Sequence, residues 1–210
     1  MADNYLEKRQ QELAERRPKV VRPHPSLDSL LKRNRSYRGY DNSRKVTEED
    51  LKKMLEVVPW VASGMNAQPL RFRPVTGADA ARVHPLVKLG AALPAEHLPH
   101  AGEEPSAYIA ICSTVPESKA VEIDLGIAAQ SILLKAVEMG LGGIFILNFD
   151  PSAVQGALGL PLKPLALLGI GKPAEQVFLI PAKAGDSLDY YRKDGGHFVP
   201  KLGVEDLLLK

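Results

Sequence analysis

The hydrophobic positions of the chain follow a helical period in some segments and a strand period in others. After Thr47, apolar residues recur at intervals of three and four, and Asp50 stands where a capping box places its acidic partner. The longest helical pattern covers Glu122–Met139 and ends at Gly140, a residue typical of helix C-termini. The remaining predicted helices cover residues 26–34, residues 78–87 and the segment that begins at Asp150-Pro151.

Short apolar runs bounded by turn residues predict strands between these helices. The predicted strands cover residues 70–76, 108–113, 143–149 and 165–170, with a shorter one at 177–180. The segment Gly90–Pro105 holds three prolines and two glycines, so it predicts a long loop. Because helices and strands alternate unevenly, we predict an α+β fold with a mixed central sheet flanked by helices.

The helix predicted at residues 122–139 is apolar on nearly every side, which is typical of a buried helix. Its small residues Gly126, Ala128 and Ala129 leave room for a second backbone to approach closely. A domain of this length with one sheet is too small to cover all of these faces. We therefore expect the helix to lie centrally or in a large homodimer interface.

Two parts of the chain differ in composition. Residues 1–25 are predicted to form a charged helix at Asn4–Arg17, followed by an extended proline-containing linker. The apolar face of that helix is too thin to make it stable alone in water. Residues 26–210 are predicted to form a single domain, long enough to bury a core.

Composition narrows the classes of partner. Hydrophobic residues make up 45% and charged residues 25% of the 210 residues, as in soluble globular proteins. A net charge of +2 gives no general reason to expect nucleic acid as a partner. No apolar run approaches the roughly 20 residues that cross a bilayer. The charged N-terminus lacks the apolar core of a signal peptide and Cys112 is the only cysteine, so we expect a cytoplasmic protein without membrane contact.

Several common catalytic motifs are absent from the sequence. It contains no G-x-G-x-x-G after a strand, no H-E-x-x-H and no G-x-S-x-G, so a Rossmann site, a metal site and a serine hydrolase are not expected. The run from Gly169 to Lys172 resembles half of a phosphate loop, but Pro173 stands where Ser or Thr would bind magnesium. That run is interpreted as a strand end and a turn.

A basic cluster follows the first predicted helix of the domain. Its members are Arg35, Ser36 and Arg38, and Arg33 lies just before them. Arginine forks match phosphate oxygens, and a serine hydroxyl adds a neutral donor. The cluster is therefore a candidate phosphate site, although a solvated basic turn has the same composition.

A second cluster, the amide loop, precedes the strand predicted at residues 70–76. It contains Ser63, Gly64, Asn66 and Gln68. An amide side chain both donates and accepts hydrogen bonds, which suits the edge of a flavin pyrimidine. An ordinary turn rich in Gly, Asn and Pro is the alternative interpretation.

Taken in order, these segments resemble the nitroreductase family. The family's R-R-S-x-R element is similar to residues 34–38, and its P-S-x-x-N-x-Q-P-W-x-F element is similar to residues 62–72. The D-x-G-x-A start of its long helix resembles residues 124–128. Its G-L-G, L-G-L-P and I-G-x-P elements resemble residues 140–142, 158–161 and 170–173. Each element is short, but all occur in the family's order between Ser26 and about Ala174.

The resemblance implies an intertwined α+β homodimer with two FMN sites, each built from both subunits. It implies that Arg35, Ser36 and Arg38 hold the phosphate and ribityl chain, and that the amide loop reaches the flavin of the other subunit. Backbone donors near flavin N5 correspond to Leu147 and Asn148. A basic residue near the C-terminus completes the phosphate site. The candidates for that residue are Arg192 and, as its rival, Lys193.

Three positions depart from the family's pattern. Asn34 replaces the first arginine, Leu70 replaces a tryptophan, and Asn148 stands where glycine is common. These departures leave the predicted FMN site in place and give no prediction for the substrate pocket.

The resemblance further implies an FMN-dependent oxidoreductase. It would transfer hydride from NAD(P)H to a small-molecule acceptor such as a nitroaromatic or a quinone with ping-pong kinetics, and the flavin rather than a side chain would carry the chemistry. Two alternatives lie within the fold, a flavin-dependent dehalogenase and an azoline oxidase. Two others lie outside this class: a flavin-binding module and a structural dimer, both without reductase turnover.

Overall fold

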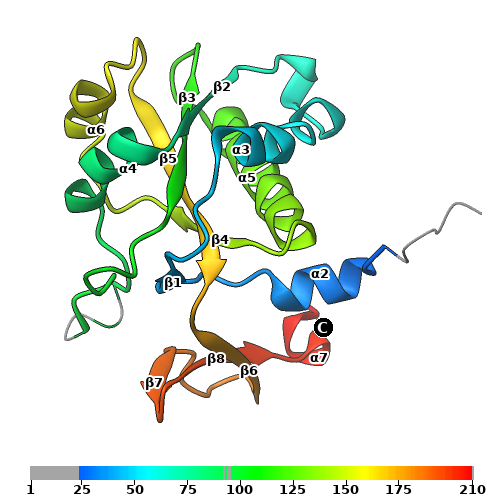
Figure 1. Ribbon diagram of the computed structural model, residues 1–210. Coiled ribbons are helices and arrows are strands. Elements are labelled where there is room, and N and C mark those ends of the chain that lie inside the picture. Colours follow the sequence, from blue (N-terminus) through cyan, green and yellow to red (C-terminus); the bar gives the residue numbers. More distant parts are fainter. Residues whose placement is uncertain (1–23, 92, 94–95, 210) are drawn as a thin grey trace, which may run out of the picture.

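The computed structural model describes residues 24–91, 93 and 96–209. The helix expected at Asn4–Arg17 lies outside these residues. The chain forms a five-stranded sheet with helices on both faces, and a smaller three-stranded sheet built from its C-terminal part (Figure 1). The expected α+β class is confirmed.

Strand β5 (Pro164–Pro173) organises the larger sheet. It pairs with β1 (Tyr40–Asp41), β3 (Ala107–Ser113) and β4 (Gly142–Ile146), and β2 (Leu70–Val75) pairs with β3. All of these pairings are antiparallel. Parallel pairing occurs at two other places: an isolated bridge joins Ser36 to Gly143, and two strands of the smaller sheet are parallel.

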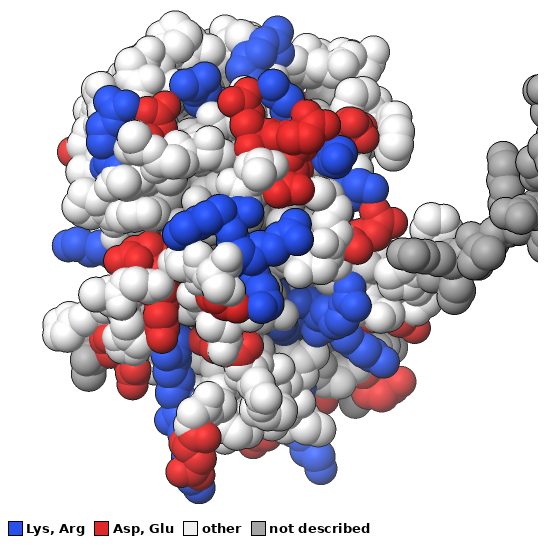
Figure 2. All heavy atoms as spheres, in the orientation of Figure 1, with Lys and Arg blue, Asp and Glu red and all other residues white. Residues whose placement is uncertain are grey.

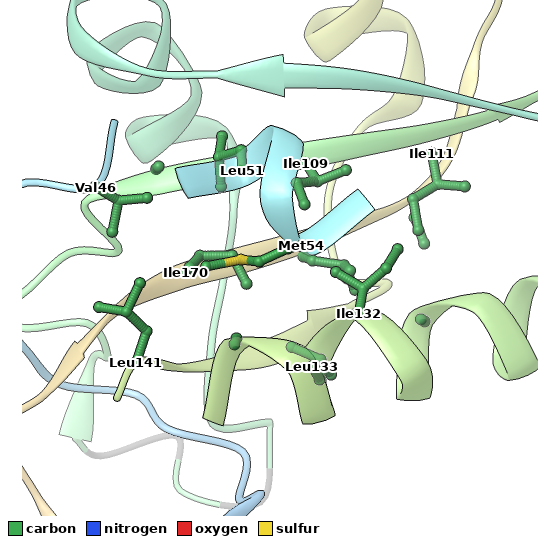
Figure 3. Close-up of a cluster of buried hydrophobic side chains, with 14 of the residues drawn as sticks. Val46, Leu51, Met54, Ile109, Ile111, Ile132, Leu133, Leu141 and Ile170 are labelled. Carbon is green, nitrogen blue, oxygen red and sulfur yellow. The ribbon is translucent and has the colours of Figure 1, made fainter. Parts of the chain in front are cut away.

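The larger sheet is buried on both faces because apolar residues occupy successive positions of its strands. Ile109 and Ile111 of β3 pack into one core with α3 (Glu48–Leu55) and α5 (Lys119–Glu138). The intervening Tyr108 and Ala110 pack into a second core with α4 (Gly77–Val83) and α6 (Pro151–Leu158). Figure 3 shows the first core, in which α3 and α5 meet the sheet through the labelled residues Leu51, Met54, Ile132 and Leu133.

Local sequence signals set most helix starts. Ser26 caps α2 (Leu27–Arg33), both hydrogen bonds of the Thr47 and Asp50 capping box are present, and Asp150 caps α6. Helix α5 begins at Lys119, earlier than predicted, because the Ser118 side chain accepts from the backbone N–H of Val121.

Helix α4 is shorter than predicted. It ends at Val83, and the 3₁₀ turn η3 (His84–Leu86) follows it. Pro85 explains the change because it has no backbone N–H to continue the helical ladder. Strand β4 also ends earlier than predicted, at Ile146.

The smaller sheet was predicted only in part. It consists of β6 (Gln176–Ala182), β7 (Tyr191–Lys193) and β8 (Gly196–Leu202), and the short helix α7 (Val204–Leu207) follows. No strand was predicted at β7 or β8, and β8 contains Pro200, a residue that strand interiors disfavour. Pro200 is tolerated beyond the residues that pair with β7, where β8 has only β6 beside it.

One side of α5 faces outward in the single chain. Ile123 is 53% exposed, and Gly126 and Gln130 are exposed on the same side. Ala128 and Ala129, in contrast, belong to the buried core. The expectation that three small residues of this helix admit a second backbone is therefore wrong for both alanines and stands only for Gly126. No helix among the described residues combines the length and apolar character that crossing a membrane requires.

Candidate functional site

The basic cluster lies on a segment held against the start of β4. Ser36 forms the parallel bridge with Gly143, and the backbone N–H of Tyr37 donates to the Gly143 carbonyl at 3.3 Å. A Cβ atom at Gly142 would lie 2.6 Å from the Tyr37 ring, so glycine is required for this approach. The two glycines of β4 thus fix the position of the basic cluster.

A cavity of about 300 Å³ opens beside this segment, between it and the smaller sheet. Its lining contains the whole basic cluster and three polar side chains from the C-terminal part. The lining residues are Asn34, Arg35, Ser36, Arg38, Val177, Tyr190, His197, Val199 and Lys201. None of these residues carries a carboxylate, so the cavity is cationic.

The pairing of the smaller sheet explains why these C-terminal residues share the cavity. Val177 of β6 lies opposite His197 of β8, and side chains alternate between the faces of a strand. His197, Val199 and Lys201 therefore lie on one face of β8. On the face of the molecule that Figure 2 shows, basic and acidic side chains are interspersed.

Arg38 is the most deeply buried cation of the cavity, at 8% exposure. Its Nη1 donates to the Ser36 carbonyl at 2.8 Å and lies 3.3 Å from Nε2 of His197. Its guanidinium carbon lies 4.6 Å from the centroid of the Tyr190 ring, a cation–π distance. These contacts hold the guanidinium in one orientation.

Glu175 binds the same region from the turn between β5 and β6. Its carboxylate accepts from the backbone N–H of Arg38 and pairs with Arg192 at 2.6 Å. Arg192 therefore lies beside Glu175, outside the cavity lining, and Lys193 is exposed and also outside the lining. The structure brings Lys201 to the position where a C-terminal basic residue was expected.

The cavity contains buried hydrogen-bond donors without partners among the described residues. They are Nε of Arg35, Nε of Arg38 and Nδ1 of His197; Nε of the neighbouring Arg192 is a fourth. Burial lowers the pKa of Arg35 from its ordinary value. Buried donors are normally paired, so this arrangement fits an occupant that supplies acceptor oxygens and negative charge.

His197 is neutral at pH 7. Its burial, and then the charges of Arg38 and Arg192, lower its pKa from 6.5 to about 4. A neutral ring is consistent with a site in which every nearby permanent charge on the cavity wall is positive.

The depressed pKa of His197 predicts a loss of stability in acid. Between about pH 6.5 and pH 4 the unfolded state takes up a proton that the folded state does not, so the free energy of unfolding falls as the pH falls. We expect this residue to account for about 2 kcal/mol of the loss between pH 7 and pH 4.5. Urea unfolding of the wild type and of His197→Gln at both pH values measures it; parallel losses in the two proteins would contradict the prediction.

The amide loop is held by a buried carboxylate. Asp124 of α5 accepts from the Ser63 hydroxyl at 2.6 Å and from the Gly64 backbone N–H at 2.9 Å. Asn66 and Gln68 have positive φ angles, 54° and 46°, and Gln68 donates to the Asn66 side chain at 2.9 Å. The loop thus keeps a strained backbone and presents its amide groups to solvent.

Within one chain the amide loop and the basic cluster do not meet. The amide loop contacts α5 at Asp124, whereas Arg33, next to the basic cluster, donates to the Val137 carbonyl near the other end of the helix. These two points lie about 20 Å apart along the helix axis. A ligand much shorter than this separation cannot contact both clusters of one chain.

Leu147 and Asn148 lie just beyond the end of β4, and both are exposed. The Asn148 carbonyl accepts from the backbone N–H of Lys88 at 3.1 Å. Gly143, beside the basic cluster, lies about 13 Å earlier along the same strand. One strand therefore connects the cationic cavity to the predicted N5 position.

The described residues contain no group of His, Cys, Asp and Glu side chains arranged to hold a metal ion. Tyr190, His197 and Lys201 were not predicted as site residues. His197, Val199 and Lys201 occupy alternate positions in the sequence, and this spacing could have predicted that His197 and Lys201 share one face of a strand. Only the tertiary structure places that face in the same cavity as Arg38.

Comparisons with solved structures agree on the fold. A nitroreductase family protein from Clostridium difficile 630 is 22% identical, with a TM-score of 0.56 over 72% of this chain and 86% of that chain. A variant of the FMN- and NADPH-dependent nitroreductase NfnB from a Sphingopyxis strain is 19% identical, with a TM-score of 0.60 over 71% and 89%. An FMN-dependent nitroreductase from Clostridium difficile R20291 is 21% identical, with a TM-score of 0.57 over 71% and 89%.

The fold and the site define an α+β protein with a cationic cavity between its N-terminal segment and a small C-terminal sheet. The sequence profile of the nitroreductase family matches residues 31–172, and the chain belongs to this family. No protein among the curated sequences compared with the chain matches it. Tyr190, His197 and Lys201 lie outside the matched range.

Proposed function

We propose that this protein is an FMN-dependent oxidoreductase that passes hydride from NAD(P)H to a small acceptor such as a nitroaromatic or a quinone, with ping-pong kinetics. The observation that carries the proposal is the cationic cavity. Arg35, Arg38 and His197 line it with buried N–H groups that lack partners. Family membership and the FMN-dependent relatives support the choice of ligand.

The FMN phosphate fits the cavity by chemistry. A phosphate monoester offers several acceptor oxygens and about two negative charges. Arg35 and Arg38 supply guanidinium donors, Ser36 a hydroxyl and Lys201 an ammonium group. In this assignment Lys201 rather than Arg192 is the C-terminal basic residue that binds the phosphate, because the charge of Arg192 is paired with Glu175.

The rest of the cofactor would extend toward the end of β4, where Leu147 and Asn148 are exposed. FMN would supply the hydride chemistry, and the protein would supply position and charge. The amide loop of Ser63, Gly64, Asn66 and Gln68 would complete the site from a second subunit, because it lies too far from the basic cluster of its own chain.

A homodimer follows from this arrangement. The exposed side of α5, with Ile123 and Gly126, is the surface that would pack against the second copy. The NfnB relative is FMN- and NADPH-dependent, which supports a nicotinamide as the hydride donor here.

Turnover distinguishes the proposed enzyme from a flavin-binding module. FMN-loaded protein is mixed with NADPH or NADH under anaerobic conditions, and a nitroaromatic or quinone is then added. We expect nicotinamide oxidation in two separable stages, first reducing the flavin and then passing the hydride on. FMN-loaded protein that accepts no hydride from either nicotinamide would contradict the oxidoreductase and leave a flavin-binding module.

A further inference from the structure

We propose that His197 is a direct ligand of the anion in the cationic cavity, donating its Nδ1–H to a phosphate oxygen as a neutral ring. The inference rests on the proposed function for the identity of that anion, the phosphate of FMN. It adds a ligand that lies outside the part of the chain matched by the family profile.

The tautomer of His197 follows from its contact with Arg38. The two nitrogen atoms, Nη1 of Arg38 and Nε2 of His197, lie 3.3 Å apart. A guanidinium can only donate, so Nε2 must accept. A neutral imidazole that accepts at Nε2 carries its proton at Nδ1. Arg38 therefore fixes His197 as an Nδ1–H donor.

That donor is buried and has no partner. His197 is 2% exposed, and its Nδ1 makes no hydrogen bond to the described residues. The Tyr190 ring lies 5.2 Å from the imidazole by centroids, which limits the directions the ring can turn. His197 belongs to the cavity lining with Arg35 and Arg38, and each of the three residues carries a buried N–H without a partner among the described residues.

The chemistry of the wall selects the occupant. The buried side-chain donors without a partner among the described lining residues are all N–H groups, and the lining has no carboxylate that could supply the missing acceptor. An oxyanion with several oxygens satisfies these donors together. A neutral histidine adds a hydrogen bond without adding a positive charge beside Arg38 and Arg192.

Two substitutions separate the direct contact from support of Arg38. The Asn side chain can place its amide nitrogen near the position of Nδ1, whereas the Gln side chain reaches the position of Nε2. His197→Asn therefore keeps the donor and loses the Arg38 contact, and His197→Gln keeps the Arg38 contact and loses the donor. The affinities of both variants for FMN and for riboflavin, which lacks the phosphate, are measured by fluorescence titration.

We expect His197→Gln to bind FMN about tenfold more weakly than the wild type, as loss of a hydrogen bond to a charged group predicts. His197→Asn should stay within about threefold of the wild type. Riboflavin should bind all three proteins equally. Equal FMN affinities in all three proteins, a greater loss in the Asn variant, or matching losses for riboflavin would overturn the proposal.

Inorganic phosphate keeps this test independent of the proposed function. If the wild type binds no FMN, the proposed function fails, and the rise in melting temperature with added phosphate then decides the inference. The wild type and His197→Asn should be stabilised by phosphate, and His197→Gln much less. A phosphate effect that is absent or equal in all three proteins would overturn it, and a long-range ¹⁵N spectrum of the wild type that places the His197 proton on Nε2 would do the same.

Discussion

Replacement of Arg38 by alanine is expected to weaken FMN binding by roughly tenfold to a hundredfold, the effect of losing a charge-assisted hydrogen bond. Arg38 is the most buried cation of the cavity, and its Nε has no partner among the residues that the structure describes. Its contacts with Ser36, His197 and Tyr190 fix the guanidinium before a ligand arrives, so little ordering is needed on binding. Equilibrium titration of the variant with FMN measures the loss.

Arg33→Ala is the matched control. Arg33 is exposed, lies outside the cavity lining, and donates from Nη2 to the Val137 carbonyl at 2.8 Å. Its loss should lower the free energy of unfolding by about 1 kcal/mol and leave FMN affinity close to that of the wild type. Equal losses of FMN affinity in the two variants would show that the phosphate lies elsewhere.

Substitution of Gly126 by glutamate is expected to convert the proposed dimer to monomers. A Cβ at Gly126 meets nothing within 4 Å in the single chain, so a larger side chain fits an isolated subunit without strain. In the proposed dimer the same position packs against a second copy, where an unpaired carboxylate would be buried at a cost of several kcal/mol. Light scattering at micromolar concentration reports the change in mass.

FMN retention should fall with dimer content in this variant, because the amide loop would contribute to the site of the partner. Gly126→Ala is the control for the backbone. This substitution stabilises the helical conformation by roughly 1 kcal/mol and adds one methyl group but no charge. A charge at Ala129 would be a poor probe, since Ala129 is 3% exposed and lies in the core of its own subunit. A Gly126→Glu protein that remains dimeric would exclude this side of α5 as the interface.

The predictable parts of the fold were those set by local signals. The Thr47 and Asp50 capping box, the Asp150 cap and the continuous apolar runs of β3 and β5 depend on neighbouring residues, and all could be recognised in the sequence. The short strands β1 and β7 and the proline-containing β8 were missed. Strand β1 pairs with β5, which lies far along the chain, and Pro200 argues locally against β8. Strand β7 pairs with its sequence neighbour β8, so it forms only where β8 is in place.

The residues of the candidate site also fall into those that the sequence could predict and those that it could not. Arg35, Ser36 and Arg38 could be predicted because three polar groups occupy adjacent positions of one segment. His197 and Lys201 could not, because they reach the cavity only after β8 pairs with β6. The pairing of Arg192 with Glu175 could not be predicted from the sequence either, and whether Arg192 contacts a phosphate stays a prediction.

Equilibrium titration of the purified 210-residue chain with FMN tests the central claim most directly. The account predicts saturable binding of one FMN per chain, with riboflavin binding at least about tenfold more weakly because it lacks the phosphate. Protein that takes up no FMN, or that binds riboflavin as tightly as FMN, would contradict the assignment of the cationic cavity as a phosphate site.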